Sequence, residues 1–211
     1  MGVIFINATL KIYQSIFTII IVMFSFNSIT INAETAGCLL DIDGNPIEYN
    51  KSYYMEPYLF NGRGIAYETW LGEEFVLLQH ESSPSPSGQT IRFEHYAGIG
   101  GNRYVQMGDW TIIRADSPPV SGLDMFGYNP TYHGVQLGTV ASAPKLPKDT
   151  QVWIPDSASE NINGLQINNY FAFRNLYNNK YLSYKNTNSK SWLDARKDNI
   201  QEETLWRFIA K

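Results

Sequence analysis

Short apolar and aromatic runs recur along most of this 211-residue chain, separated by Gly, Pro, Asn and Ser. We find no stretch with the three-to-four-residue apolar spacing of an amphipathic helix. Short runs bounded by turn residues are typical of β-strands, and many of them in succession favour a sandwich or a barrel-like fold. The pattern therefore predicts an all-β domain of about twelve short strands, at residues 52–59, 64–70, 75–80, 90–96, 103–107, 110–115, 134–140, 151–155, 170–175, 180–184, 192–195 and 205–209.

The spacing of the tryptophans indicates an internal repeat. Trp70, Trp110, Trp153 and Trp206 recur at intervals of roughly forty to fifty-three residues, the range in which repeated structural units show themselves. The final stretch has an aromatic strand, an Asn178–Asn179 turn, a polar loop and a closing Trp-x-Phe strand. We expect three pseudo-repeats, at 38–95, 96–149 and 150–211, forming a three-lobed barrel, the β-trefoil. A two-sheet sandwich is the alternative.

Residues 1–33 are expected to be a secretory signal peptide rather than part of the fold. Their only charged residue is Lys11, an apolar run occupies 16–26, and Ala33 supplies a small residue for cleavage. The alternatives are a membrane anchor and a lipoprotein cut before Cys38. A cut after Ala33 leaves residues 34–211, which have the size of one domain, and makes the protein secreted.

Charge and cysteine content narrow the partners. The formal net charge of −4, without a basic stripe, gives no electrostatic case for binding nucleic acid. Cys38 is the single cysteine, so no disulfide can form within the chain. We therefore expect a monomer, with a dimer linked through Cys38 as the alternative.

Motifs for catalysis, metal binding or a cofactor are missing from the sequence. No pair of its three histidines has metal-ligand spacing, and neither a nucleophile elbow nor a phosphate-binding glycine loop occurs. Asp41 and Asp43 fit turn positions better than a calcium loop, because no third carboxylate follows at the spacing of such a loop. We expect a protein that is not an enzyme and that uses no cofactor or metal.

Two strings give a sharper expectation. LLDIDGNPI at 39–47, followed by Tyr53–Tyr54, and FVLLQ at 75–79, followed by a Pro/Ser-rich loop and TIRF at 90–93, resemble the plant Kunitz (soybean trypsin inhibitor type) family. The resemblance implies a β-trefoil whose protruding loop enters a protease active site. The residues it assigns to that loop are Ser85, Pro86, Ser87, Gly88, Gln89, Thr90 and Ile91. Thr90 falls on the primary specificity position.

Departures from the family pattern change the expected target. Trypsin inhibitors place Arg or Lys at the primary position, and Thr90 cannot pair with the carboxylate of a trypsin pocket. Tyr49 stands where the family has a loop-supporting Asn, and the family's disulfide cysteines are missing. The expected function is a secreted protease inhibitor directed at elastase-, subtilisin- or cysteine-type proteases rather than trypsin.

The alternative is a secreted carbohydrate-binding or toxin-associated binding module. Sugar sites place an aromatic ring against the apolar sugar face and use Asp, Asn or Gln for the hydroxyls. Trp192 and Asp194, in a polar segment, are the candidate sugar-binding residues, and the segment 128–133 is a second cluster of this kind.

Overall fold

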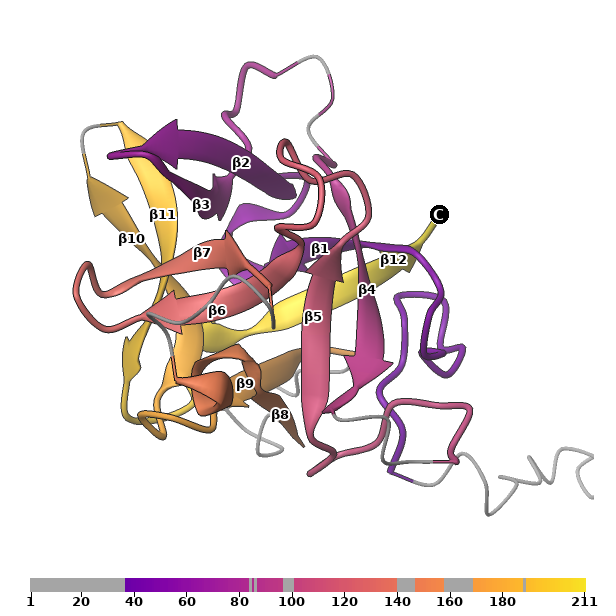
Figure 1. Ribbon diagram of the computed structural model, residues 1–211. Helices are drawn as coiled ribbons and strands as arrows, with labels where there is room; N and C mark the ends of the chain where they lie inside the picture. The colour runs from indigo at the N-terminus through magenta and orange to yellow at the C-terminus, as the bar shows by residue number, and fades with distance from the viewer. Residues whose placement is uncertain are drawn as a thin grey trace, which may run out of the picture. The chain divides into compact units, whose positions relative to one another are not determined.

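Twelve strands form in the described part of the chain, and the apolar runs of the sequence supply most of them (Figure 1). The computed structural model describes residues 37–83, 85, 87–96, 101–139, 147–157, 169–187 and 189–211. The expected signal segment 1–33, together with Pro84 and Pro86, lies outside the described residues. Residues 37–211 form the compact unit described below.

The strands fall into three groups of four. The first group is β1 (Tyr53–Pro57), β2 (Ile65–Trp70), β3 (Glu73–Leu78) and β4 (Thr90–His95). The second is β5 (Thr111–Ala115), β6 (Met125–Asn129), β7 (Gly134–Gly138) and β8 (Trp153–Ser157). The third is β9 (Phe171–Asn175), β10 (Tyr181–Thr187), β11 (Lys190–Lys197) and β12 (Trp206–Ala210).

The same pairing repeats in each group and closes a barrel. First and fourth strands pair within a group, as β1 with β4, β5 with β8, and β9 with β12. Neighbouring groups join through β4 with β5, β8 with β9, and β12 with β1, so six strands form a closed ring. Second and third strands form three hairpins, β2–β3, β6–β7 and β10–β11, which we call the hairpin cap. This is a β-trefoil, as predicted.

The barrel interior is filled by alternate residues of its strands, because successive side chains of a strand point to opposite faces. Phe93 of β4, Phe173 of β9 and Phe208 of β12 are fully buried and meet in a triangle, with ring centroids 5.3 to 5.7 Å apart. Centroid separations in this range are favourable for aromatic pairs. The barrel core therefore draws on strands far apart in the sequence.

Two large tryptophans occupy equivalent places in the second and third groups. Trp153 opens β8 and pairs with the first residue of β5, and Trp206 opens β12 and pairs with the first residue of β9. Both are fully buried. Each donates its indole N–H to a carbonyl of its own group's hairpin, Trp153 to Phe126 at 2.9 Å and Trp206 to Leu182 at 3.1 Å. These bonds tie the hairpin cap to the barrel.

Three sequence predictions need correction. The expected strand at 103–107 is wrong, because Tyr104 and Gln106 make only isolated bridges to Glu48 and Cys38. Strand β6 was missed, since all five of its residues are buried and no polar alternation marks it. The third repeat does not begin at 150, because β8 closes the second group by pairing with β5.

The opening turn forms as its sequence predicts. The Asp41 carboxylate accepts hydrogen bonds from the backbone N–H groups of Asp43 and Asn45, at 3.0 and 2.8 Å. Gly44 has a φ of +82°, a conformation that Gly adopts without steric cost. The Asp41 carboxylate therefore stabilises the turn.

Cys38, just before this turn, is 6% exposed, so a disulfide to a second chain would require this part of the structure to open. Short 3₁₀ helices occur at Tyr58–Phe60, Lys148–Gln151 and Glu202–Thr204. No helix long and apolar enough to cross a membrane is found among the described residues.

Candidate functional site

The loop between β3 and β4 is held firmly at its base. The N–H of Gln79 bonds to the carbonyl of Gly64 at 2.7 Å, and the N–H of Gln89 bonds to the carbonyl of Ile65 at 2.7 Å. The backbones approach so closely that a Cβ on Gly64 would lie 1.7 Å from the Ser87 carbonyl oxygen. Between these anchors Ser85 and Gln89 are exposed, while Ser87 and Gly88 are partly buried. Pro86, also expected to contact a protease, lies outside the described residues.

Thr90 and Ile91 do not belong to the exposed part of this loop. They are the first residues of β4, where Thr90 pairs with Tyr54 and Ile91 with Tyr53, and they are 7% and 0% exposed. The residues that precede Trp153 and Trp206 in the other groups, Val152 and Leu205, are also buried. By the threefold pairing, Thr90 stands at their equivalent position in the barrel wall. This placement counts against Thr90 as the side chain that enters a protease pocket.

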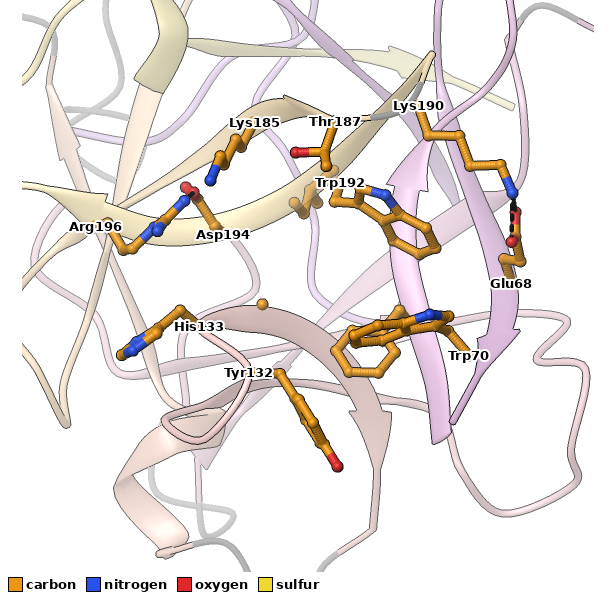
Figure 2. Close-up of a pocket in the computed structure, with 13 residues that line it drawn as sticks. Glu68, Trp70, Tyr132, His133, Lys185, Thr187, Lys190, Trp192, Asp194 and Arg196 are labelled. Carbon is orange, nitrogen blue, oxygen red and sulfur yellow. Dashed lines mark hydrogen bonds and ion pairs between the residues drawn. The ribbon is translucent and has the colours of Figure 1, made fainter. Parts of the chain in front are cut away.

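A pocket lies instead in the hairpin cap, where each of the three hairpins contacts the other two (Figure 2). Strand β3 pairs with β11 at Leu77 and Trp192, and with β7 at Phe75 and Gln136. The cavity has a volume of about 440 Å³, within the range of pockets that hold small ligands. All three groups of strands therefore build one site together, whereas the sequence predicted separate candidate sites, each within one group.

One end of the cap pocket is aromatic. Trp70 comes from the end of β2, Phe75 from β3, Tyr132 from the β6–β7 turn and Trp192 from β11. Trp70 meets Phe75, Tyr132 and Trp192 with centroid separations of 5.5, 5.6 and 6.4 Å. Phe75 is buried beneath the cluster, while Trp70 and Tyr132 remain 45% and 42% exposed. The cluster thus leaves large aromatic rings open to solvent.

The other end of the cap pocket is polar (Figure 2). The buried Asp194 carboxylate accepts a hydrogen bond from the Ser183 hydroxyl and two from the Arg196 guanidinium, at 2.9 and 2.8 Å. On the aromatic side, Lys190 binds both carboxylate oxygens of Glu68 at 2.5 and 2.6 Å. The Lys190 ammonium also lies 5.7 Å from the centre of the Trp192 ring.

The alternation of side chains along β10 and β11 explains why these residues are on the pocket side of the hairpin rather than on the core side. In the β10–β11 hairpin Ser183 pairs with Asp194, Lys185 with Trp192 and Thr187 with Lys190, so these six residues share one face. The opposite face carries Leu182, Tyr184, Leu193 and Ala195, which are buried in the core. The alternation of side chains along β10 and β11 therefore determines both which residues pack in the core and which residues face the pocket.

The structure brings together two clusters that sequence analysis treated separately. Trp192 and Asp194 both line the pocket, and they are joined by Tyr132 and His133 from the 128–133 segment. Tyr128 of that segment is buried instead, with its hydroxyl 2.9 Å from Nδ1 of His133. Trp70, Phe75 and Glu68 were missed. The available signal was Trp70 placed directly before Leu71–Gly72, a hairpin turn whose tip leaves its flanking residue half exposed.

No cluster of three or more His, Cys, Asp or Glu side chains able to hold a metal occurs among the described residues. Among the described residues that line the pocket, the Glu68 carboxylate binds Lys190, and the Asp194 carboxylate binds Arg196 and the Ser183 hydroxyl.

Comparisons with known proteins identify the fold. No family model and no curated protein matches the chain. Among solved structures, alocasin, a protease inhibitor from giant taro (Arum macrorrhizon), matches with a TM-score of 0.63 and 15% identity over 83% of this chain and 99% of alocasin. The rice (Oryza sativa) bifunctional alpha-amylase/subtilisin inhibitor gives 0.60 and 13%, over 82% and 98%.

A third match is the binding domain of Paraclostridial Mosquitocidal Protein 1, with a TM-score of 0.59 and 17% identity over 83% of this chain and 45% of that one. These three similar structures are two inhibitors and a binding domain. At such identities the likeness concerns the fold alone. The chain folds as a β-trefoil of the kind found in Kunitz-type inhibitors, as its opening turn and its TIRF strand predicted.

Proposed function

We propose that this protein is an exported β-trefoil binding module that holds a sugar in the cap pocket. The observation that carries the proposal is the aromatic cluster of Trp70, Tyr132 and Trp192 beside the buried Asp194 carboxylate, in which Trp70 and Tyr132 are half exposed and Trp192 is partly buried. The binding domain of a toxin among the similar structures supports a binding role for this fold.

The physical argument starts from the exposed rings. A large apolar surface left in water is unfavourable, and contiguous patches of it commonly mark binding sites. Trp153 and Trp206 show that this chain can bury its tryptophans fully, but Trp70 stays 45% exposed although three other rings surround it. A sugar ring laid on this cluster would cover it with C–H groups, while its hydroxyls would face the polar end around Asp194.

The proposal is tested by screening residues 34–211 on a glycan array and repeating the screen with Trp192→Ala. Trp110→Ala is the matched control, because Trp110 is also half exposed (51%) but does not line the pocket. We expect glycan signals that Trp192→Ala abolishes and Trp110→Ala preserves. An array without signals, or signals that both variants retain, would remove the proposal.

A second function, protease inhibition, is favoured by the clamped base of the β3–β4 loop. A loop held by hydrogen bonds at Gly64 and Ile65 loses little conformational freedom on binding, which is how a preorganised loop gains affinity. Kunitz-type inhibitors among the similar structures suggest a protease as the partner. We propose that the contact residues are the exposed ones, Ser85 and Gln89, with elastase-, subtilisin- or cysteine-type proteases as targets.

A panel of these proteases, run with the wild type, Gln89→Arg and Thr90→Arg, tests the loop. If the loop enters a protease cleft in its observed conformation, the wild type should inhibit a non-trypsin protease, and Gln89→Arg should add trypsin inhibition. Thr90→Arg should instead destabilise β4. A loop that every protease cleaves, without inhibition, is a linker.

A further inference from the structure

Charges in the cap pocket are not balanced, and the excess is positive. The two carboxylates are already used, since Glu68 binds Lys190 and Asp194 binds Ser183 and Arg196. Lys185 also lines the pocket, is exposed, and has no hydrogen-bond or ion-pair partner among the described residues. With Lys185, Lys190 and Arg196 against Glu68 and Asp194, a cation is left over to meet a ligand.

Lys185, the cation in excess, stands next to Trp192 of the aromatic cluster in the sheet. Lys185 and Trp192 are directly opposite each other in the β10–β11 hairpin, so their Cβ atoms are about 5 Å apart on the same face. In the view of Figure 2, Lys185, Asp194 and Arg196 lie on one side of the pocket, and Trp70 and Trp192 lie on the other. A ligand whose ring lies against Trp70 and Trp192 would therefore reach Lys185 and Arg196 with a group attached to that ring.

Other ligand classes fit this arrangement less well. A cationic ligand would meet three positive side chains and would compete with Lys190, which already lies over the Trp192 ring at 5.7 Å. A neutral sugar would make no ion pair with the Lys185 ammonium, and its hydroxyls would share both carboxylates with the donors already bound to them.

We infer, on the basis of the proposed sugar-binding function, that the ligand is an acidic sugar. Its ring lies against Trp70 and Trp192, and its carboxylate or sulfate group binds between Lys185 and Arg196. Charge-assisted hydrogen bonds to such groups are shorter and stronger than neutral ones. Asp194 then acts as a positioning residue, because its two bonds to Arg196 fix the direction of that guanidinium.

The test uses matched glycans in a fluorescence or calorimetric titration of residues 34–211. One arm holds oligosaccharides ending in glucuronic acid or sialic acid, a second holds sulfated oligosaccharides, and a third holds their uncharged counterparts. We expect binding of an acidic arm, at least five- to tenfold weaker binding of its neutral counterpart, and a similar loss in Lys185→Ala. Raising the salt concentration should weaken the acidic arm only.

Lys148→Ala is the matched control, since Lys148 is an exposed lysine that does not line the pocket, and it should bind as the wild type does. Equal binding of charged and neutral glycans, or full affinity in Lys185→Ala, would overturn the acidic-sugar inference and leave the proposed function standing. Loss of binding in Lys148→Ala as well as Lys185→Ala would also overturn it. No binding of any glycan would refute the proposed function itself.

Discussion

Replacing Trp206 by Phe tests the physical account of how the hairpin cap is fastened to the barrel. Trp206 is fully buried, and its indole N–H donates to the Leu182 carbonyl of β10 at 3.1 Å. Phe keeps an aromatic ring in place but removes this donor and part of the ring volume. The loss can therefore be divided into one hydrogen bond, some apolar surface and a small cavity.

Trp206→Phe is expected to lower the free energy of unfolding by about 3 kcal/mol. A net contribution of about 1 kcal/mol belongs to the buried hydrogen bond. Roughly 40 Å² of lost apolar burial adds about 1 kcal/mol. A cavity of roughly 35 Å³, at 24 cal/mol per Å³, adds just under 1 kcal/mol more. Trp153→Phe should cost a similar amount, because Trp153 occupies the equivalent place and donates to Phe126.

Urea unfolding, followed by circular dichroism, is the assay. If the free energy of unfolding falls by about 2 kcal/mol per M of urea, the urea concentration at the unfolding midpoint should fall by roughly 1.5 M, with that slope unchanged. Trp110→Phe is the control, because Trp110 is half exposed, and its midpoint should move by no more than about 0.3 M. If Trp206→Phe shifted the midpoint no further than Trp110→Phe does, the reasoning would be refuted.

Three further predictions concern the loop, the alkaline range and the N-terminus. Gly64→Ala would place a Cβ 1.7 Å from the Ser87 carbonyl oxygen, so we expect it to lower the melting temperature and to speed proteolytic cleavage between residues 81 and 89. Unchanged cleavage would contradict the inference that Gly64 holds the base of the β3–β4 loop. Burial, with the nearby Glu203 carboxylate, raises the pKa of Tyr184 to about 12 from its ordinary value of 10.0, and its hydroxyl has no hydrogen-bond partner in the described structure. The stability that depends on neutral Tyr184 is complete below pH 10 and is lost as the pH rises towards 12. Tyr184→Phe should therefore match the wild type at pH 7 and lose less stability above pH 10, as measured by urea unfolding. Equal losses in the two proteins would contradict the burial argument. Mass spectrometry of the exported protein should show a chain that begins at Glu34; an intact Met1, or a lipid on Cys38, would exclude the expected cut after Ala33.

Local chemistry explains which parts of the fold could be predicted. The opening turn depends on Asp41 and Gly44, which are close in sequence, and the Asn178–Asn179 turn depends on the left-handed conformation that Asn179 adopts with a φ of +58°. Such features need no information from the rest of the chain.

Other features depend on contacts between distant segments. Thr90 stands at the end of a loop in the sequence, but pairing with Tyr54 places it in the barrel wall. Strand β6 is buried along its whole length by neighbouring strands, so periodicity does not reveal it. The residues of the cap pocket were predicted only in part, as Trp192 with Asp194 and, separately, the segment 128–133. Trp70, which meets Trp192 in the pocket, lies more than a hundred residues earlier in the chain.

The central claim, that a sugar binds in the cap pocket, is tested most directly by the tryptophan indole N–H signals in a nitrogen–proton NMR spectrum. The chain has five tryptophans, and Trp→Phe variants assign them. We predict that a glycan identified on the array shifts the signals of Trp70 and Trp192, which line the pocket, and leaves those of Trp153 and Trp206 in place. Shifts confined to Trp110, or a bound glycan that moves none of the five signals, would contradict the account.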